Sequence, residues 1–455
     1  MVKKLFYLSM LGMALTSCEN NKEEIGANQI KFITVDPGHF HAALVQKYNY
    51  SEVDSTVHVY APKGDDVNLH LNRIEAFNTR QENPTNWKTI LYEGDDFFEK
   101  MLSEKKGNVL VLAGNNGKKT EYINKAVANG LNVLADKPMA INVDDFKLLK
   151  ETFALASKNN VLLYDVMTER FEITSILQRE LSMNKTIFGE LEKGTPEYPA
   201  IIKESVHHFY KYVSGTVLTR PAWFFDVNQQ GEGIVDVTTH LVDLVQWQCF
   251  PNQILHEGDV DISSATRTPT YISKSEFEAV TKLDHFPDYL QNAVVNDSVL
   301  AVFSNGEINY KLKDVHAKVS VKWNYKAPEG TTDTHFSKMR GTKATLVIKQ
   351  GAEQNYEPTL YIETRELSPN YIADVIKEFE KLEKKYNGIS LEASPMGWKV
   401  VIPESYKNGH EAHFAQVTDA FIEYLTEGNM PEWEIPNMIT KYYTTTKALE
   451  IAKSN

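Results

Sequence analysis

The strongest constraint on the fold is the alternation of short apolar runs with amphipathic segments between residues 30 and 165. The apolar runs predict strands at 30–35, 57–60, 108–112, 132–135 and 161–165. The amphipathic segments predict helices at 67–77, 118–129 and 144–158. Strand–helix–strand units at this spacing indicate a doubly wound parallel sheet, in which ligands bind beyond the carboxyl ends of the strands.

The turn after the first predicted strand carries an incomplete glycine pattern. Only Gly38 is present where the dinucleotide-binding sequence G-x-G-x-x-G has three glycines. A strand, a glycine turn and a short helix begin a dinucleotide-binding fold, but an ordinary strand–turn–helix explains the same residues. Asp65 and Asp66 follow the second strand, so the choice between NAD and NADP stays open.

The pattern changes past about residue 172. Alternating runs at 201–212, 298–303, 307–312, 317–323, 345–349 and 359–363 predict half-buried antiparallel strands. The last hundred residues predict helices at 369–386, 410–427 and 439–453. The predicted fold class is therefore α/β, with a Rossmann-type domain at 29–165. An α+β domain with an open, mostly antiparallel sheet follows at 166–455, which is the usual arrangement of a cofactor domain with a substrate platform.

The N-terminus has the features of a lipoprotein signal peptide. Two lysines precede an apolar run that is too short to cross a bilayer, and Leu-Thr-Ser-Cys at its end matches the bacterial lipobox. We therefore expect a signal peptide at 1–17, lipidation of Cys18 and a polar tether at 18–28. The expected location is the bacterial cell envelope, periplasmic or anchored to the outer membrane, with the lipid as the only membrane contact.

The composition excludes several classes of partner. The formal net charge is −13, and cleavage before Cys18 leaves 46 basic and 61 acidic residues, a net charge of −15. A chain this acidic without a basic run is a poor candidate for binding nucleic acid or anionic lipid. Cys249 is the only other cysteine, so no internal disulfide is available, and we expect it to be a small buried side chain.

Two segments carry side chains suited to acid–base chemistry. Helical periodicity after Gly231 and Gly233 predicts that Asp236 and His240 share one helix face, where a carboxylate can orient an imidazole. A buried helix whose Asp and His satisfy each other explains this spacing equally. Lys137 follows a predicted strand and precedes a proline, so it can bond a substrate hydroxyl or be a solvated turn residue.

The sequence does not indicate a metal site. The 13 histidines are scattered along the chain. The candidate groupings are His39-x-His41, His207-His208 and His410-x-x-His413. None of them has a convincing matched set of carboxylate or cysteine ligands.

The order of these motifs resembles the Gfo/Idh/MocA oxidoreductases, which include glucose–fructose oxidoreductase and inositol dehydrogenase. The resemblance rests on the glycine turn, an Asn-containing strand end, Asp136-Lys137-Pro138 as [ED]-K-P, and D-x-x-x-H-x-x-D from Asp236 to Asp243. It covers nearly all of the mature chain, including the ending HFAQVTDAFIEYLTEGNMPEW. The pattern departs from the family in its reduced glycines and in Lys119, which replaces a common histidine.

The resemblance implies a cofactor and a set of site residues. The cofactor is NAD or NADP, with NAD preferred. Lys137 and Asp236 orient a substrate hydroxyl, and His240 takes its proton as hydride leaves to the nicotinamide. The cofactor contacts implied are Gly38, His39, Phe40, Asn115, Asn116, Asp136 and Lys137.

The substrate contacts are hypotheses that lie mainly in a segment without an obvious equivalent in the family, at 204–226. Flat aromatic rings stack on sugar faces, and arginine bonds hydroxyl groups. The candidates are Arg170, His207, His208, Tyr210, Arg220 and Trp223. His207 and His208 alternate on a predicted strand, so we expect one of them to point into packing.

Three functions remain open. The first is a dehydrogenase of a sugar, polyol or glycoside. The second is a redox-neutral glycosidase or sugar-modifying enzyme that keeps its NAD bound, because free dinucleotide is scarce outside the cytoplasm. The third is a non-catalytic sugar-binding lipoprotein that lost the cofactor. In each case the expected partner is a small carbohydrate, and the resemblance implies a homo-oligomer, a dimer or a tetramer.

Overall fold

The computed structural model describes residues 30–213, 216–329, 331–364 and 366–454. The predicted signal peptide, Cys18 and the tether lie outside the described residues. Among the described residues, no helix combines the length and the apolar character that a membrane crossing requires.

The first sheet is the predicted doubly wound sheet. Six parallel strands follow the order β3-β2-β1-β4-β5-β6. The strands are β1 (Phe32–Val35), β2 (Thr56–Ala61), β3 (Lys88–Glu93), β4 (Val109–Leu112), β5 (Asn132–Asp136) and β6 (Leu163–Val166). The helices are α1 (His41–Leu44), α2 (Asp65–Thr79), α3 (Phe97–Glu104), α4 (Lys119–Ala128) and α5 (Val143–Asn159). Because β1 and β4 are adjacent, the strand order reverses between them, which is where such sheets bind ligands.

The second sheet has ten strands and is mostly antiparallel, as predicted. Its order is β10-β12-β13-β7-β14-β15-β16-β18-β17, with β11 paired to β12 and one parallel pair, β13 with β7. The strands are β7 (Ile201–Tyr210), β10 (Val260–Ser273), β11 (Val294–Val295), β12 (Val299–Leu312), β13 (Val315–Lys326), β14 (Thr334–Arg340), β15 (Ala344–Lys349), β16 (Thr359–Thr364), β17 (Ser390–Ser394) and β18 (Gly397–Val401). A separate two-stranded ribbon contains β8 (Tyr212–Val213) and β9 (Thr216–Val217).

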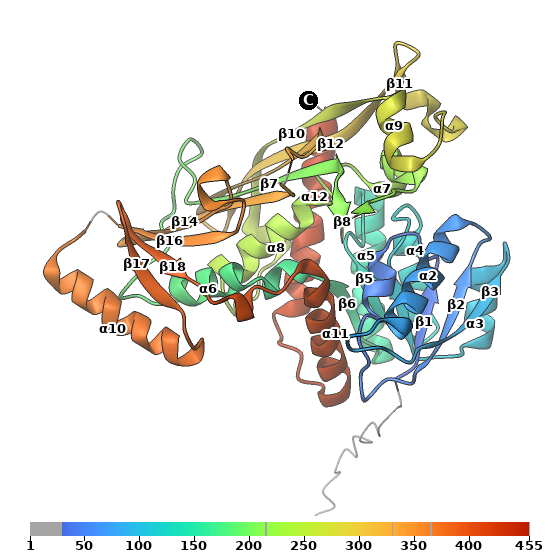
Figure 1. Cartoon of the computed structure of the whole chain (residues 1–455), viewed down its shortest axis with the longest axis horizontal. Coiled ribbons are helices and arrows are strands. Elements are labelled where there is room, and N and C mark those ends of the chain that lie inside the picture. The colour runs from blue at the N-terminus through green and yellow to red at the C-terminus, as the bar shows by residue number, and fades with distance from the viewer. Residues whose placement is uncertain (1–29, 214–215, 330, 365, 455) are drawn as a thin grey trace, which may run out of the picture.

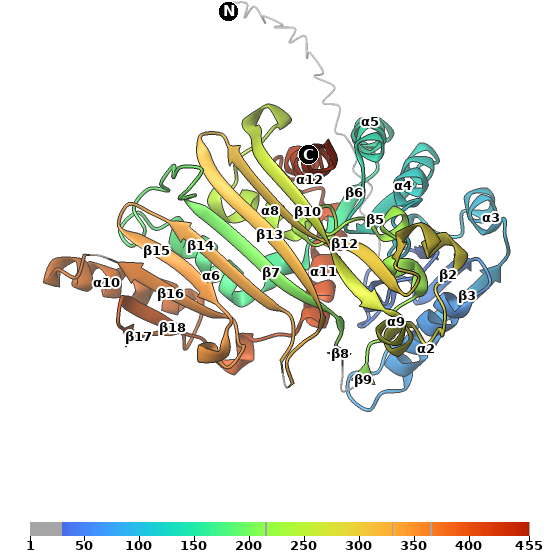
Figure 2. The ribbon, with the colours of Figure 1, turned by 90° about the horizontal axis from the view of Figure 1, so that it is seen from above.

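Helices cover only one face of the second sheet. The helices of this half are α6 (Ile173–Ser182), α7 (Val227–Gln230), α8 (Thr238–Cys249), α9 (Lys274–Thr281), α10 (Pro369–Lys385), α11 (His410–Glu427) and α12 (Glu434–Ser454). The buried side chains of β12, β13 and β15 pack in one core with those of α6 and α8. Seen from above, the opposite face of the sheet carries no helix (Figure 2). It is therefore the open sheet that the sequence predicts.

The C-terminal helices also complete the first domain. Phe414 and Phe421 of α11 and Tyr442 of α12 belong to the core of the parallel sheet, whereas Leu449 of α12 belongs to the core of the second sheet. Helix α12 runs between the two sheets (Figure 1). The packing unit around the parallel sheet therefore does not end at residue 165.

Candidate active site

The centre of the candidate site is an ion pair between the two domains. Lys137 follows β5 directly, and its Nζ lies 2.6 Å from Oδ1 of Asp236, which belongs to the second domain. Both side chains are about nine-tenths buried. Burial alone would lower the pKa of Lys137, but the Asp236 and Asp136 carboxylates raise it above its usual value. The ammonium therefore keeps its charge at neutral pH.

The structure corrects the predicted helix around Asp236. Helix α8 begins at Thr238, so Asp236 lies in the turn before it and not on its face. The turn is nevertheless helical in its bonding, because the backbone N–H of Asp236 donates to Glu232 O (3.0 Å) and that of His240 donates to Val237 O (3.0 Å). Asp236 and His240 therefore stay about one turn apart, as the spacing predicts.

His240 is a neutral imidazole in this setting. Burial lowers its pKa well below the ordinary value, and the charge of Lys137 lowers it further. Its Nδ1 is buried without a hydrogen-bond partner among the described residues. Asp236 does not bond to His240, since its two oxygens bond to Lys137 and to Gln230. The interpretation in which the two side chains merely satisfy each other is therefore wrong.

A chain of hydrogen bonds holds the Asp236 oxygen that does not bind Lys137. Gln230, the last residue of α7, donates from Nε2 to Oδ2 of Asp236 (3.0 Å). Asn116 Nδ2 donates to the backbone oxygen of Gln230 (2.7 Å). Lys119 donates to Asn116 Oδ1 and to the backbone oxygen of Asp136 (2.9 Å). The chain links the end of β5, directly before Lys137, to the carboxylate that binds Lys137, so one network positions both charges.

This network uses residues that the sequence assigned to the cofactor. Asn115 Nδ2 donates to Gln229 Oε1 (2.6 Å), and the backbone N–H of Asn116 donates to Gln229 O (2.8 Å). The Asn-containing turn after β4 therefore docks on α7 of the second domain. Lys119 is fully buried, and burial lowers its pKa to about 8.

The turn after β1 folds like a glycine-rich turn despite its single glycine. Asp36 has a φ of 46°, the left-handed conformation that asparagine and aspartate tolerate best after glycine. It lies two residues before Gly38, the spacing of the first two glycines in G-x-G-x-x-G. A side chain at Gly114 would place its Cβ 2.1 Å from Asp36 O, so the neighbouring turn also approaches closely. The backbone therefore fits a dinucleotide, a feature that the sequence pattern alone obscured.

Two acidic side chains stand at this turn. Burial, together with the nearby Asp66 carboxylate, raises the pKa of Asp36 to about 6. Asp66 lies in the first turn of α2, directly after the second strand, where an acidic residue accepts ribose hydroxyls in NAD-binding folds.

Trp223 covers the exposed side of the same turn. Its Nε1 donates to Asp66 Oδ2 (2.9 Å), and its Cζ2 lies 3.0 Å from the place that a Cβ at Gly38 would occupy. Its indole therefore lies against the glycine turn, where a pyrophosphate approaches in such folds, rather than presenting an open stacking face to a sugar.

The structure gathers His39 and His41 beside Asp136, which lies 95 residues after His41 in the sequence. Oδ2 of Asp136 is 2.8 Å from Nδ1 of His41 and 3.6 Å from Nδ1 of His39. Phe40 between them packs against both imidazoles and under Arg73. The argument that His39-x-His41 lacks a carboxylate is therefore wrong, because the fold supplies one at the end of β5.

The end of β7 forms a second polar cluster around Asp333. Nδ1 of His207 (3.1 Å), Nδ1 of His208 (3.2 Å) and Nζ of Lys211 (2.5 Å) all meet its carboxylate. Burial alone would raise the pKa of Asp333, but His207, His208 and Lys211 hold it well below its usual range. Both histidines contact this carboxylate, and His208 is also buried in the packing, as expected for one of the pair.

The remaining predicted substrate residues have different surroundings. Arg220 is buried, donates to the backbone oxygens of His208 and Phe209, and stacks on Phe224. Tyr210 lies among Tyr212, Tyr325 and Lys326. These contacts place both side chains at the β7 end.

Arg170 lies in a buried charge network between the domains. It binds Asp243 through two bonds of 2.7 Å and Glu434 through bonds of 2.8 and 3.0 Å. Lys441 joins the network at Asp243 and at Asp165 of β6 (2.8 Å each). The Arg170 guanidinium therefore binds one carboxylate of α8, that of Asp243, and one of α12, that of Glu434.

Sequence reasoning missed several members of the site. Gln230, Lys211 and Asp333 carry no local motif and become site residues only through tertiary contacts. Glu169 is another site residue that sequence reasoning missed. Burial and the nearby Glu172 carboxylate raise its pKa to about 7, although the charge of Lys137 lowers it. Its position directly before Arg170, at the end of a predicted strand, was the available signal.

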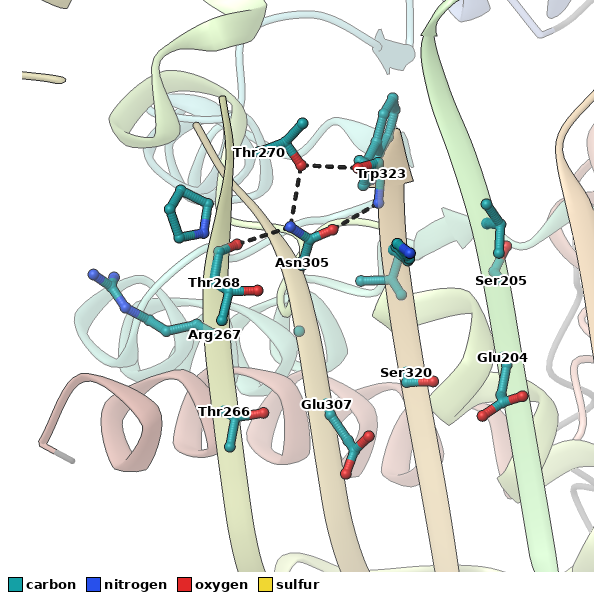
Figure 3. Close-up of a pocket in the computed structure, with 15 residues that line it drawn as sticks. Glu204, Ser205, Thr266, Arg267, Thr268, Thr270, Asn305, Glu307, Ser320 and Trp323 are labelled. Atoms are coloured by element: carbon teal, nitrogen blue, oxygen red, sulfur yellow. Dashed lines mark hydrogen bonds between the residues drawn. The ribbon is translucent and has the colours of Figure 1, made fainter. Parts of the chain in front are cut away.

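A larger hollow lies away from this site. A cavity of about 610 Å³ opens on the uncovered face of the second sheet, lined by β7, β10, β12 and β13 (Figure 3). Asn305 bridges its upper end by donating to Thr270 Oγ1 and accepting from the backbone N–H of Trp323. Gly306 packs on Ile234 at the opposite face, so Asn305 and Glu307 point away from the turn that holds Asp236.

The comparisons with known proteins agree with this arrangement. The sequence model described as "Oxidoreductase family, NAD-binding Rossmann fold" matches residues 35–165, and the one described as "Putative oxidoreductase C terminal domain" matches residues 177–453. No curated protein matches the chain.

Solved structures resemble the whole chain. A crystal structure described as "a putative oxidoreductase" from Parabacteroides merdae is 57% identical, with a TM-score of 0.92, covering 94% of this chain and 99% of that one. Levoglucosan dehydrogenase in complex with NADH and levoglucosan is 10% identical (TM-score 0.60, coverage 93% and 97%). Biliverdin reductase from Synechocystis with biliverdin and NADP+ is also 10% identical (TM-score 0.55, coverage 94% and 100%). The last two show the fold alone.

The parallel sheet with its dinucleotide turn, the open second sheet and the matches over both halves lead to one assignment. The chain belongs to the Gfo/Idh/MocA family and is an NAD(P)-dependent oxidoreductase.

Proposed function

We propose that this oxidoreductase oxidises a hydroxyl group of a sugar, polyol or glycoside, with Lys137, Asp236 and His240 as its working residues. The observation that carries the proposal is the 2.6 Å Lys137–Asp236 ion pair across the two domains, with a neutral His240 one turn beyond Asp236. The third candidate, a non-catalytic binding protein, loses its support because the family assignment is to an oxidoreductase.

The residues divide the chemistry between them. Lys137 keeps its proton and donates a hydrogen bond to the reacting oxygen, which stabilises the negative charge that develops there. Asp236 anchors the ammonium and is itself held by Gln230. His240 accepts the hydroxyl proton, since its buried imidazole is neutral in this setting. When bound, the nicotinamide supplies the hydride acceptor.

The cofactor would lie along the turns after β1 and β4. Gly38 would hold the pyrophosphate through its backbone, and Asp66 is placed to bond ribose hydroxyls. We propose NAD over NADP, because the carboxylates of Asp66 and Asp36 would repel a 2′-phosphate.

Polar and aromatic groups at the end of β7 support a polyhydroxylated substrate. His207, His208 and Lys211 offer hydrogen-bond donors around Asp333, and Tyr210 and Tyr325 offer flat faces. Such a mixture of polar groups and aromatic rings suits sugars.

The test of the working residues is His240→Asn. We expect kcat to fall by about 100-fold or more, because the general base is lost, while the dissociation constant for NAD changes by less than about twofold. His285→Asn, which changes an exposed histidine outside the site, is the matched control and should leave both constants unchanged. Full turnover by His240→Asn would exclude His240 as the base.

A second candidate is favoured by the indole over the glycine turn. Trp223 bridges the domains through Asp66 and lies directly against the glycine turn, so its indole would have to move before a cofactor enters or leaves, and the cofactor would exchange slowly. Slow exchange suits a redox-neutral enzyme that oxidises its substrate and later reduces it on the same cofactor.

This candidate predicts product without net formation of reduced nicotinamide. It also predicts that Trp223→Ala speeds the loss of bound cofactor during gel filtration, whereas Trp247→Ala, which removes a distant indole, does not. One reduced nicotinamide released for each product molecule would decide for a net dehydrogenase.

A further inference from the structure

The imidazoles of the β1 turn and the carboxylate at the end of β5 converge on one point. The nitrogen and oxygen atoms of His39, His41 and Asp136 that can bind a metal all lie within 4.8 Å of one another. The three side chains are largely buried, with exposed fractions of 18%, 9% and 7%. We propose that they form a binding site for one divalent transition-metal ion.

The separations match a first coordination shell. Zinc–nitrogen and zinc–oxygen bonds of about 2.1 Å place tetrahedral ligands about 3.4 Å apart. The two measured separations from Asp136 Oδ2 are 2.8 Å to His41 and 3.6 Å to His39. Small rotations of the side chains would therefore bring all three atoms to bonding distance from one ion.

Hydrogen bonding alone does not account for the position of His39. The backbone N–H of His41 points at Nδ1 of His39 (3.4 Å), so this nitrogen presents its lone pair. The same nitrogen faces Asp136 Oδ2 at 3.6 Å, which is too long for a hydrogen bond. A metal ion would replace the His41 N–H as the partner of the His39 lone pair, and would replace the proton that His41 Nδ1 and Asp136 Oδ2 share in their 2.8 Å hydrogen bond.

The lysines beside the cluster do not fill this position. Lys137 binds Asp236, and Lys119 binds Asn116 and the backbone oxygen of Asp136. Neither ammonium bonds to the Asp136 carboxylate in the part of the chain that the structure describes. The carboxylate therefore remains directed at the two imidazoles.

The donor set indicates the class of metal. Two imidazole nitrogens and one carboxylate oxygen favour zinc, iron, cobalt or manganese over calcium and magnesium, which prefer oxygen alone. Three protein ligands leave a position for water or a substrate oxygen. His410 of α11 lies next to the cluster, with its ring centroid 5.4 Å from that of His41, and forms one wall of this position.

The cluster begins one residue after the glycine turn and has its own neighbours. Gly38 meets Trp223 and Asp66, whereas His41 meets Asp136, His410 and Phe414. Because His39 and Asp136 are also cofactor contacts that the family resemblance implies, metal binding is tested on nucleotide-free protein, and the test does not depend on turnover.

The experiment is a cobalt titration of the untagged protein after dialysis against a chelator. We expect one equivalent of Co2+ per chain, with the visible absorption of cobalt bound to imidazole, and displacement by one equivalent of Zn2+. His39→Asn and Asp136→Asn should each weaken binding by at least about 100-fold. His285→Asn, an exposed histidine paired with Asp284, is the matched control and should bind like the wild type.

Circular dichroism of the metal-free variants checks that they fold. His39 is the more exposed of the two histidines, so His39→Asn keeps the test valid if Asp136→Asn is unstable. A wild-type protein that takes up no stoichiometric cobalt would overturn the proposal. Equal binding by the wild type and the folded His39→Asn variant would do the same.

Discussion

Buried imidazoles determine how this protein responds to acid. His70 in α2 is almost fully buried, and neither ring nitrogen has a hydrogen-bond partner among the described residues. Burial lowers its pKa to about 3. Between these two pKa values, the unfolded chain, whose histidine has a pKa of about 6.5, binds a proton that the folded chain does not bind.

This difference predicts a loss of stability on acidification. Stability is complete above pH 6.5 and falls as the pH drops from there toward 3, because protons favour the unfolded state in that range. In His70→Leu the loss should be smaller by about 2 kcal/mol between pH 7 and pH 5. Urea unfolding at both pH values measures it, with His285→Leu as the exposed control. Equal pH dependence in the wild type and His70→Leu would contradict the assigned burial effect.

At the same scale, Asp36 shows why a residue pattern can mislead. The sequence lacks the first glycine of the dinucleotide turn, so its residues are explained equally by an ordinary strand–turn–helix. The structure gives Asp36 the left-handed backbone that this position requires. A search for tolerated residues, and not for glycine alone, would recover the turn.

At the scale of elements, α7 and the turn after β4 act together on Asp236. Gln230→Leu removes the donor to Asp236 Oδ2 and leaves that oxygen buried without its partner. We expect kcat to fall by about tenfold through displacement of Lys137, and stability to fall by about 1–3 kcal/mol.

The matched control for Gln230→Leu is Gln229→Leu. It removes the bond from Asn115 at the same domain junction but leaves Asp236 untouched. Steady-state kinetics should therefore show a much smaller change in kcat for this variant. Equal losses in the two variants would mean that the junction as a whole matters, and not the bond to Asp236.

Element prediction from the sequence succeeded where apolar runs were continuous. It missed β3, an edge strand whose residues are all at least partly exposed. It also divided β12 into two strands at Asn305-Gly306, a pair that looks like a turn. Gly306 is needed in the strand because a Cβ there would lie 2.7 Å from the side chain of Ile234. Only the tertiary contact explains that glycine.

The residues of the candidate site also fall into two groups, those that the sequence predicts and those that only the structure reveals. Lys137, Asp236 and His240 follow from spacing and family resemblance, and the structure brings Lys137 and Asp236 together. Gln230, Asp333 and the Asp136 carboxylate beside His41 depend on contacts between segments that are distant in sequence. No local pattern could have found them.

At the scale of the whole molecule, one face of the ten-stranded sheet has no cover. We expect two copies of the chain to pack through this face, because a symmetric pair would bury it with one kind of contact. Light scattering after gel filtration should give a mass of at least twice that of the chain. Ser320→Arg, in the middle of the face, should lower that mass, whereas Ser103→Arg in α3 should not. A monomeric wild type would contradict this expectation.

The terminal helix ties the two halves of the chain into one enzyme. Helix α12 contributes to both hydrophobic cores, and its Lys441 joins Asp165 of the first domain to Asp243 of the second. Because the reacting groups come from both domains, this junction holds Lys137 against Asp236. The central claim is that the resulting site transfers hydride from a carbohydrate hydroxyl to NAD.

The most direct test is a single-turnover measurement with the protein in excess over NAD+ or NADP+ and a panel of sugars, polyols and glycosides. We predict a burst of reduced-nicotinamide absorbance with at least one compound, larger with NAD+ than with NADP+. The burst should be absent in His240→Asn, although that variant still binds the nucleotide. A burst of the same rate and size in His240→Asn, or none from the wild type with any hydroxyl compound, would contradict the account.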